Sequence, residues 1–166
     1  MSILQRLINP ATLATMFLSM KDKVQKYNET VVGFVEKKMQ QYQQKIVADF
    51  NDMETNFQQF FIVKAHAHYV NCGIVKALEP WLDCFSFGEV EKMTEANFYD
   101  YLNEQERSIM DSLDKWERKM MTESPYICST NPLNNMSYHF DREVTQQMFI
   151  ILKSCLNSIR TIKTGI

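Results

Sequence analysis

The chain has 166 residues, enough for one domain with a single hydrophobic core and too few for two. Its 4 glycines and 4 prolines make up about 5% of the sequence, against roughly 12% in average proteins, so the residues that hairpins and phosphate-binding loops need are scarce. The 18 basic and 20 acidic groups nearly balance, which argues against a nucleic-acid binder driven by bulk charge. Composition therefore disfavours an all-β or βαβ enzyme and predicts a single helical domain over residues 1–166.

The strongest pattern is a long apolar stripe that follows Asn9 and Pro10, residue types suited to an N-cap and to the first position of a helix. Its mean spacing is about 3.6 residues, as in a straight α-helix. No proline interrupts residues 11–79, so one helix of roughly 100 Å fits the pattern, whereas a break near Gly33 or Asn51-Asp52 would fold it into a hairpin. The stripe consists of Leu13, Phe17, Met20, Val24, Tyr27, Val31, Val35, Met39, Tyr42, Ile46, Phe50, Met53, Phe57 and Phe60.

The later elements follow a proline. Pro80 is expected to end or kink the first helical region, and Thr94 to cap a second helix that runs to about Met121. Residues 122–140, rich in Pro and Asn, are expected to form a long loop, and a last helix begins near Asp141. The second helix buries Phe98, Leu102, Ile109, Leu113, Trp116 and Met120, with Gln105 as its one polar residue. The last helix buries Val144, Met148, Ile151, Cys155, Ile159 and Ile162. The sequence thus predicts an all-α fold of three or four helices, packed as a bundle, a coiled coil or an extended helical hairpin.

The cysteines and histidines offer few sites for chemistry. The four cysteines contain no CxxC pair, which excludes a zinc ribbon. Cys72 and Cys84 form a possible disulfide across the corner expected at Pro80, or all four thiols are free. His68 and Cys72 are four residues apart and share a helix face, which gives half of a zinc site. We identify no catalytic residue, no cofactor site, no complete metal site and no small-molecule substrate.

The N-terminal part of the stripe predicts a partner surface. Residues 1–20 form an amphipathic segment without an acidic residue, a composition compatible with mitochondrial targeting. A helix longer than the rest of the protein would expose part of its stripe, and an exposed stripe marks a partner surface; alternatively, later helices of the same chain cover it. The predicted partner-binding residues are Leu13, Phe17, Met20, Val24, Tyr27 and Val31.

These patterns predict a non-catalytic structural or accessory subunit of a larger protein assembly, with a mitochondrial inner-membrane or respiratory complex as the favoured setting and the cytoplasm as the alternative location. Two alternative functions are also compatible with the sequence. The first is a helical module that binds the surface of an anionic membrane through basic residues, and the second is a small helical metal-binding protein built around His68 and Cys72. The basic residues of the first alternative are Lys21, Lys23, Lys26, Lys37 and Lys38.

Overall fold

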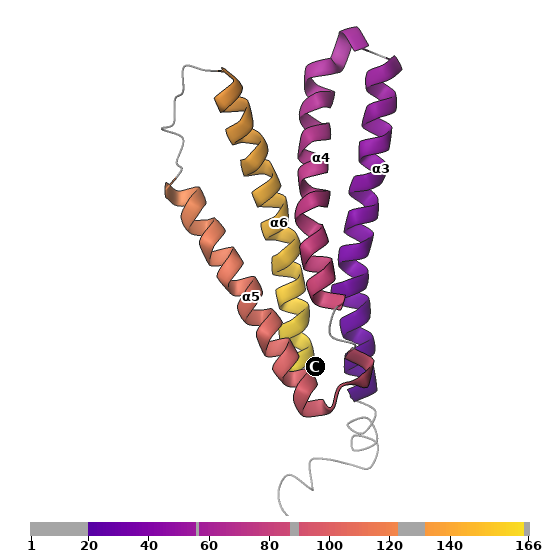
Figure 1. Ribbon diagram of the computed structural model, residues 1–166, viewed down its shortest axis with the longest axis vertical. Helices are drawn as coiled ribbons and strands as arrows, with labels where there is room; N and C mark the ends of the chain where they lie inside the picture. The colour runs from indigo at the N-terminus through magenta and orange to yellow at the C-terminus, as the bar shows by residue number, and fades with distance from the viewer. Residues whose placement is uncertain (1–19, 56, 87–89, 123–131, 165–166) are drawn as a thin grey trace, which may run out of the picture.

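The computed structural model describes residues 20–55, 57–86, 90–122 and 132–164, and within these ranges it contains helices and no strands. The predicted all-α fold is confirmed. Two antiparallel helical pairs lie side by side, with α4 in contact with α6 (Figure 1). In chain order the elements are an unlabelled α-helical stretch over residues 20–27, the π-helix η1 (Asn28–Val32), α3 (Gly33–Thr55), α4 (Phe57–Ser86), the 3-10 helix η2 (Val90–Lys92), α5 (Glu95–Thr122) and α6 (Pro132–Thr164).

The long stripe is divided between two helices. α3 ends at Thr55, and α4 begins at Phe57 and returns along it. The hairpin alternative is therefore confirmed and the continuous helix over residues 11–79 is wrong, but the break falls near residue 56, while Gly33 and Asn51-Asp52 are helical. The apolar face of α3 is covered within the chain as far as Tyr42, whose hydroxyl donates to Oε1 of Gln147 on α6 over 3.4 Å. We infer that the hairpin forms because two apolar faces bury each other.

A π-turn keeps the first part of the stripe on one face of its helix. The stripe advances in three successive steps of four residues here, which would drift by about 120° around a regular α-helix. The N–H of Gly33 donates to the carbonyl of Asn28, five residues earlier, and this wider turn absorbs most of the drift. A Cβ atom at Gly33 would lie 3.1 Å from that carbonyl oxygen, so glycine suits the close approach. The residues kept in register and buried are Tyr27, Val31, Val35 and Met39.

Three predicted boundaries can be compared with the structure. Thr94 caps α5 as predicted, because its Oγ1 accepts a hydrogen bond of 3.2 Å from the Asn97 N–H. Pro80 does not end its helix, since α4 continues to Ser86. The loop expected over residues 122–140 is too long, because α6 begins at Pro132 and not near Asp141. Proline suits a first helical position, where its missing N–H costs nothing.

The core lies between the two helical pairs. The predicted faces of α5 and α6 are buried wherever the structure describes their side chains, except that Trp116 and Val144 are half-buried. At Gly73 on α4 an added Cβ would lie only 2.8 Å from Cγ2 of Val144 on α6, so α4 and α6 approach closely there. No helix within the described residues is long and apolar enough to cross a membrane.

Candidate functional site

The predicted partner-binding residues divide into three groups. Tyr27 and Val31 are completely buried in the core, so their assignment to a partner surface is wrong. Met20 and Val24 are half-buried and pack on the edge of the core. Leu13 and Phe17 lie outside the described residues. Tyr27 and Val31 are buried because the π-turn keeps this side of the helix directed into the protein's own core.

Met20 and Val24 line a groove at the lower end of the bundle, where the first helix passes the connection between α4 and α5 (Figure 1). A cavity of about 630 Å³ is lined by Met20, Lys21, Val24, Gln25, Asn28, Glu29, Glu91 and Met93. A second cavity of about 310 Å³ shares Asn28 and Glu91 with it and is lined further by Val32, Phe85, Ser86, Val90 and Lys92. We call the two adjoining cavities the N-terminal groove. One wall is helix 20–32, including η1, and the other is formed by residues 90–93.

The floor and rim of the N-terminal groove differ chemically. Met20, Val24 and Met93 are partly buried and continuous with the core, so the floor is apolar. The rim carries the carboxylates of Glu29 and Glu91 and the ammonium groups of Lys21 and Lys92. Glu29 is held in place by Gln25, whose side-chain amide donates to its Oε1 over 3.0 Å. An apolar centre with a polar, charged rim is the usual anatomy of a protein-binding surface.

Next to the groove, the hydroxyls of two tyrosines bind the last carbonyls of α4. The last carbonyls of a helix have no partner within it, and here Phe85 is also fully buried. The Tyr27 hydroxyl lies 2.8 Å and the Tyr101 hydroxyl 2.6 Å from the Phe85 carbonyl, and Tyr101 also lies 3.0 Å from that of Cys84. Gln105 donates to the Cys84 carbonyl over 3.3 Å, which explains its buried position on an apolar face. These side chains fasten helix 20–27 and α5 to the end of α4.

Both phenols remain protonated donors at neutral pH. Burial, reinforced by the hydrogen bond to Tyr101, raises the pKa of Tyr27 far above its ordinary value. Burial also raises the pKa of Tyr101, against a smaller lowering effect of its hydrogen bond with Tyr27. The arrangement is thus suited to holding helices together, because neither hydroxyl readily loses a proton.

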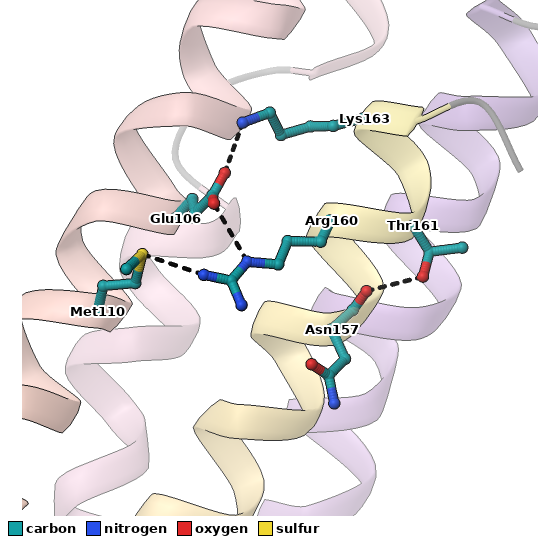
Figure 2. Close-up of polar contacts among 6 residues, drawn as sticks. All are labelled: Glu106, Met110, Asn157, Arg160, Thr161 and Lys163. Carbon is teal, nitrogen blue, oxygen red and sulfur yellow. Dashed lines mark hydrogen bonds and ion pairs between the residues drawn. The ribbon is translucent and has the colours of Figure 1, made fainter.

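A second polar cluster joins α5 to α6 (Figure 2). The carboxylate of Glu106 accepts hydrogen bonds from Arg160 Nε over 3.2 Å and from Lys163 Nζ over 2.5 Å. The guanidinium of Arg160 also reaches the sulfur of Met110 at 3.2 Å. The hydrogen bonds from Lys163 and Arg160 hold the pKa of Glu106 below its ordinary value, against the opposing effect of partial burial. All these side chains are occupied in joining the two helices.

Of the two alternatives left open for Cys72 and Cys84, the structure has the free thiols and not the disulfide. Cys72 and Cys84 lie on the same helix, because α4 continues through Pro80, where a corner was expected. Twelve residues of helix separate their Cα atoms by about 18 Å, whereas a disulfide needs roughly 4–7 Å. Cys155 is a buried free thiol, and burial raises its pKa to about 12. Cys128 lies outside the described residues.

The predicted half-site for zinc is present as a pair. Nε2 of His68 lies 3.7 Å from Sγ of Cys72, on one face of α4 as the spacing predicts. His66 points elsewhere and pairs with Glu143 of α6 at 3.0 Å. Within the described residues no group of three or more potential ligands comes together around a metal position. A structural zinc site needs four ligands, so the pair by itself is incomplete.

The basic residues of the membrane hypothesis are partly used within the chain. The ammonium group of Lys23 lies 3.4 Å from the hydroxyl of Tyr99 and over its ring. Lys38 lies over the ring of Phe34, and Lys21 lines the N-terminal groove. Lys21, Lys26 and Lys37 are exposed, whereas Lys23 and Lys38 are half-buried.

Comparison with known proteins adds no relative to this description: the chain matches no family model, and searches of curated proteins and of solved structures find no match. Its function must therefore be argued from its own geometry. The sequence indicated one wall of the N-terminal groove through Met20 and Val24, but missed the other wall at Glu91 and Met93. Those residues are some 70 positions away and carry no periodic signal.

Proposed function

We propose that this protein is a non-catalytic helical accessory subunit of a larger protein assembly, and that its N-terminal groove receives an amphipathic helix of a partner protein. The observation that supports this most strongly is the groove itself, a cavity of about 630 Å³ whose apolar floor is continuous with the core. A helix laid into such a groove would extend the core with its own apolar face.

The balance of the lining favours a protein partner over a small molecule. Five of the eight side chains of the larger cavity are polar or charged. Pockets for small molecules are predominantly apolar and enclose most of their ligand. Across the two cavities the carboxylates of Glu29 and Glu91 are balanced by the ammonium groups of Lys21 and Lys92, so the expected partner helix carries both an acidic and a basic residue beside its apolar anchors.

Large exposed apolar side chains elsewhere do not form a competing surface. Outside the groove, those that the structure describes stand on four different helices, and single exposed apolar residues are normal. They are Val47, Tyr69, Met110 and Ile150. The groove therefore remains the best-supported docking position within the described residues.

The cellular setting belongs to the same proposal. The segment before Asp22 contains no acidic residue, which supports a mitochondrial location and, with it, an inner-membrane or respiratory complex. Localisation of the full chain carrying a C-terminal tag tests this part. Salt-dependent binding to anionic vesicles but not to neutral ones would instead favour the membrane-surface module.

Site-specific photo-crosslinking tests the partner proposal. A photoreactive amino acid replaces Gln25, which is exposed at the groove, in the full chain expressed in its native cells. The matched control places it at Gln41, which is exposed on α3 away from the groove. We expect a fixed set of partner proteins to be linked from position 25 and not from position 41. Equal yields from both positions, or no partner from either, would overturn the proposal.

A further inference from the structure

We infer that Cys72 is a site of thiol–disulfide exchange with low-molecular-weight disulfides, and that its contact with His68, not its exposure, selects it. The inference is independent of the proposed function. Cys72 lies about 20 Å of helix before Phe85, which lines the second cavity of the N-terminal groove, so the two sites are separate.

The sulfur of Cys72 faces a histidine whose proton can be assigned. Nε2 of His68 lies 3.7 Å from Sγ of Cys72. Nδ1 of the same ring is buried and has no hydrogen-bond partner among the described residues. A proton on Nδ1 would therefore be a buried donor without an acceptor, which is costly, so the neutral ring carries its proton on Nε2. His68 thus directs an N–H group at the sulfur.

This N–H group favours the reactive form of Cys72. The thiolate is the species that attacks a disulfide, and a negatively charged sulfur accepts a hydrogen bond more strongly than a neutral thiol does. Lys76 lies four residues after Cys72, one turn further along the same side of α4. Its ammonium group acts in the same direction, because a neighbouring cation stabilises a thiolate.

The two other described thiols are placed less favourably. Cys84 is more exposed than Cys72, but its thiol donates a hydrogen bond of 3.3 Å to Oε1 of Gln105. Loss of that proton would leave a negative sulfur beside a carbonyl oxygen. Cys155 is buried, and burial raises its pKa to about 12, so it is neither accessible nor ionised at neutral pH. Exposure therefore ranks Cys84 first, whereas the hydrogen bonds rank Cys72 first.

The exchange step balances with the disulfide as its one reagent. With oxidised glutathione, Sγ of Cys72 attacks one sulfur, the sulfur–sulfur bond of the reagent breaks, and a new sulfur–sulfur bond joins Cys72 to one glutathione. The other glutathione leaves as a thiolate and takes up a proton from water, which had received the proton of Cys72. The sulfur of Cys72 is oxidised, and the departing glutathione is reduced.

Site-resolved kinetics on the full chain test the inference. Freshly reduced protein is incubated with oxidised glutathione at neutral pH and quenched with acid at intervals, and mass spectrometry of its peptides follows the mixed disulfide at each described cysteine. We expect Cys72 to react at least about fivefold faster than Cys84, and Cys155 to stay reduced while the protein is folded. Equal rates at Cys72 and Cys84, or a faster rate at Cys84, would overturn the inference.

Variants at His68 test the cause. His68→Leu removes the N–H group and should slow Cys72 at least about threefold, with the rate at Cys84 unchanged. His68→Gln keeps an N–H donor and should retain most of the rate. His66→Leu, the same change at a histidine that pairs with Glu143 of α6, is the matched control and should have no effect. A rate at Cys72 insensitive to His68→Leu would refute the role of His68. If His68→Leu does not fold, the ratio of the wild-type rates decides by itself.

Discussion

Helix 20–32 presents two faces that differ in what covers them. On one face Tyr27 and Val31 are completely buried, and a phenol hydroxyl is tied to the end of α4. On the other, Met20 and Val24 are only half-buried and line the N-terminal groove. The same apolar stripe supplies both faces, so spacing alone does not tell which of its members serve stability and which remain accessible to another helix.

The largest expected effect comes from placing a charge on the buried face. Val31→Asp buries an unpaired carboxylate, and we expect it to lower the free energy of unfolding by about 3 kcal/mol or more. Gln41→Asp, an exposed change on α3, should alter it by less than about 0.5 kcal/mol. Urea denaturation followed by circular dichroism measures both. Equal tolerance of the two changes would show that the buried face is not a core.

The phenols under the groove give the next largest effect. Tyr27→Phe removes one of the two hydroxyl protons that serve the carbonyls of Cys84 and Phe85, and should cost about 1–2 kcal/mol. Combined with Tyr101→Phe, it leaves the buried Phe85 carbonyl without either phenol, so the double change should cost more than the sum by about 0.5 kcal/mol or more. Tyr69→Phe, at a residue 63% exposed, is the control. Strict additivity would contradict a shared network.

The polar cluster of Glu106, Arg160 and Lys163, which joins α5 to α6, should contribute less to the free energy of unfolding, and its contribution should depend on pH. Glu106→Gln removes the acceptor of Lys163 and Arg160 and should cost about 1 kcal/mol at pH 7. Because the folded pKa of Glu106 is lowered from 4.5, the unfolded state binds more protons in acid. The contribution is therefore complete above the unfolded value and is lost as pH falls through the folded one.

Chemical denaturation at a series of pH values between 7 and 2.5 checks this prediction. The difference between the wild-type protein and Glu106→Gln should shrink below pH 4.5. The control is Asp114→Asn, since the pair of Asp114 with Arg118 is exposed and should be worth only a few tenths of a kcal/mol. A difference in free energy of unfolding that stays constant across this pH range would argue against a stabilising role of the Glu106 carboxylate.

The smallest effect on stability, but the clearest on binding, is expected at the rim. Glu91→Lys changes an exposed side chain of η2 and should alter the free energy of unfolding by less than about 0.5 kcal/mol. It should nevertheless weaken partner capture from position 25, because it reverses one of the rim charges that a complementary basic residue of the partner helix would meet. Glu117→Lys, exposed on α5, is the matched control. Unchanged capture with both variants would remove the charge argument.

The fold was largely readable from the sequence where local physics decides it. Thr94 caps α5, and the apolar faces of α5 and α6 point inward because 3.6-residue spacing directs side chains to one side of a helix. The prediction that Pro80 ends or kinks its helix rested on the cost of a proline inside a helix, about 3 kcal/mol. Here the turn beyond it is secured by buried Phe85 and by carbonyls bound to phenols from other helices.

Only one wall of the candidate site could be predicted from the sequence, because only that wall follows a local pattern. Met20 and Val24 belong to the periodic stripe, whereas Glu91 and Met93 lie in a short connection whose position depends on packing of the whole bundle. The pairing of Tyr27 with Tyr101 likewise joins residues 74 positions apart. Such contacts arise from tertiary structure, which a one-dimensional pattern does not contain.

The π-turn at Asn28–Val32 sets how residues 20–27 are rotated about the helix axis, and this rotation decides which side chains line the groove. Loss of one residue within the turn would make the helix regular and rotate residues 20–27 by about 100° relative to the core. Tyr27 would then swing out of its place at the end of α4, and a different set of side chains would line the groove. A one-residue deletion here would thus rewrite the docking surface more completely than any substitution on it, with the composition of the wall almost unchanged.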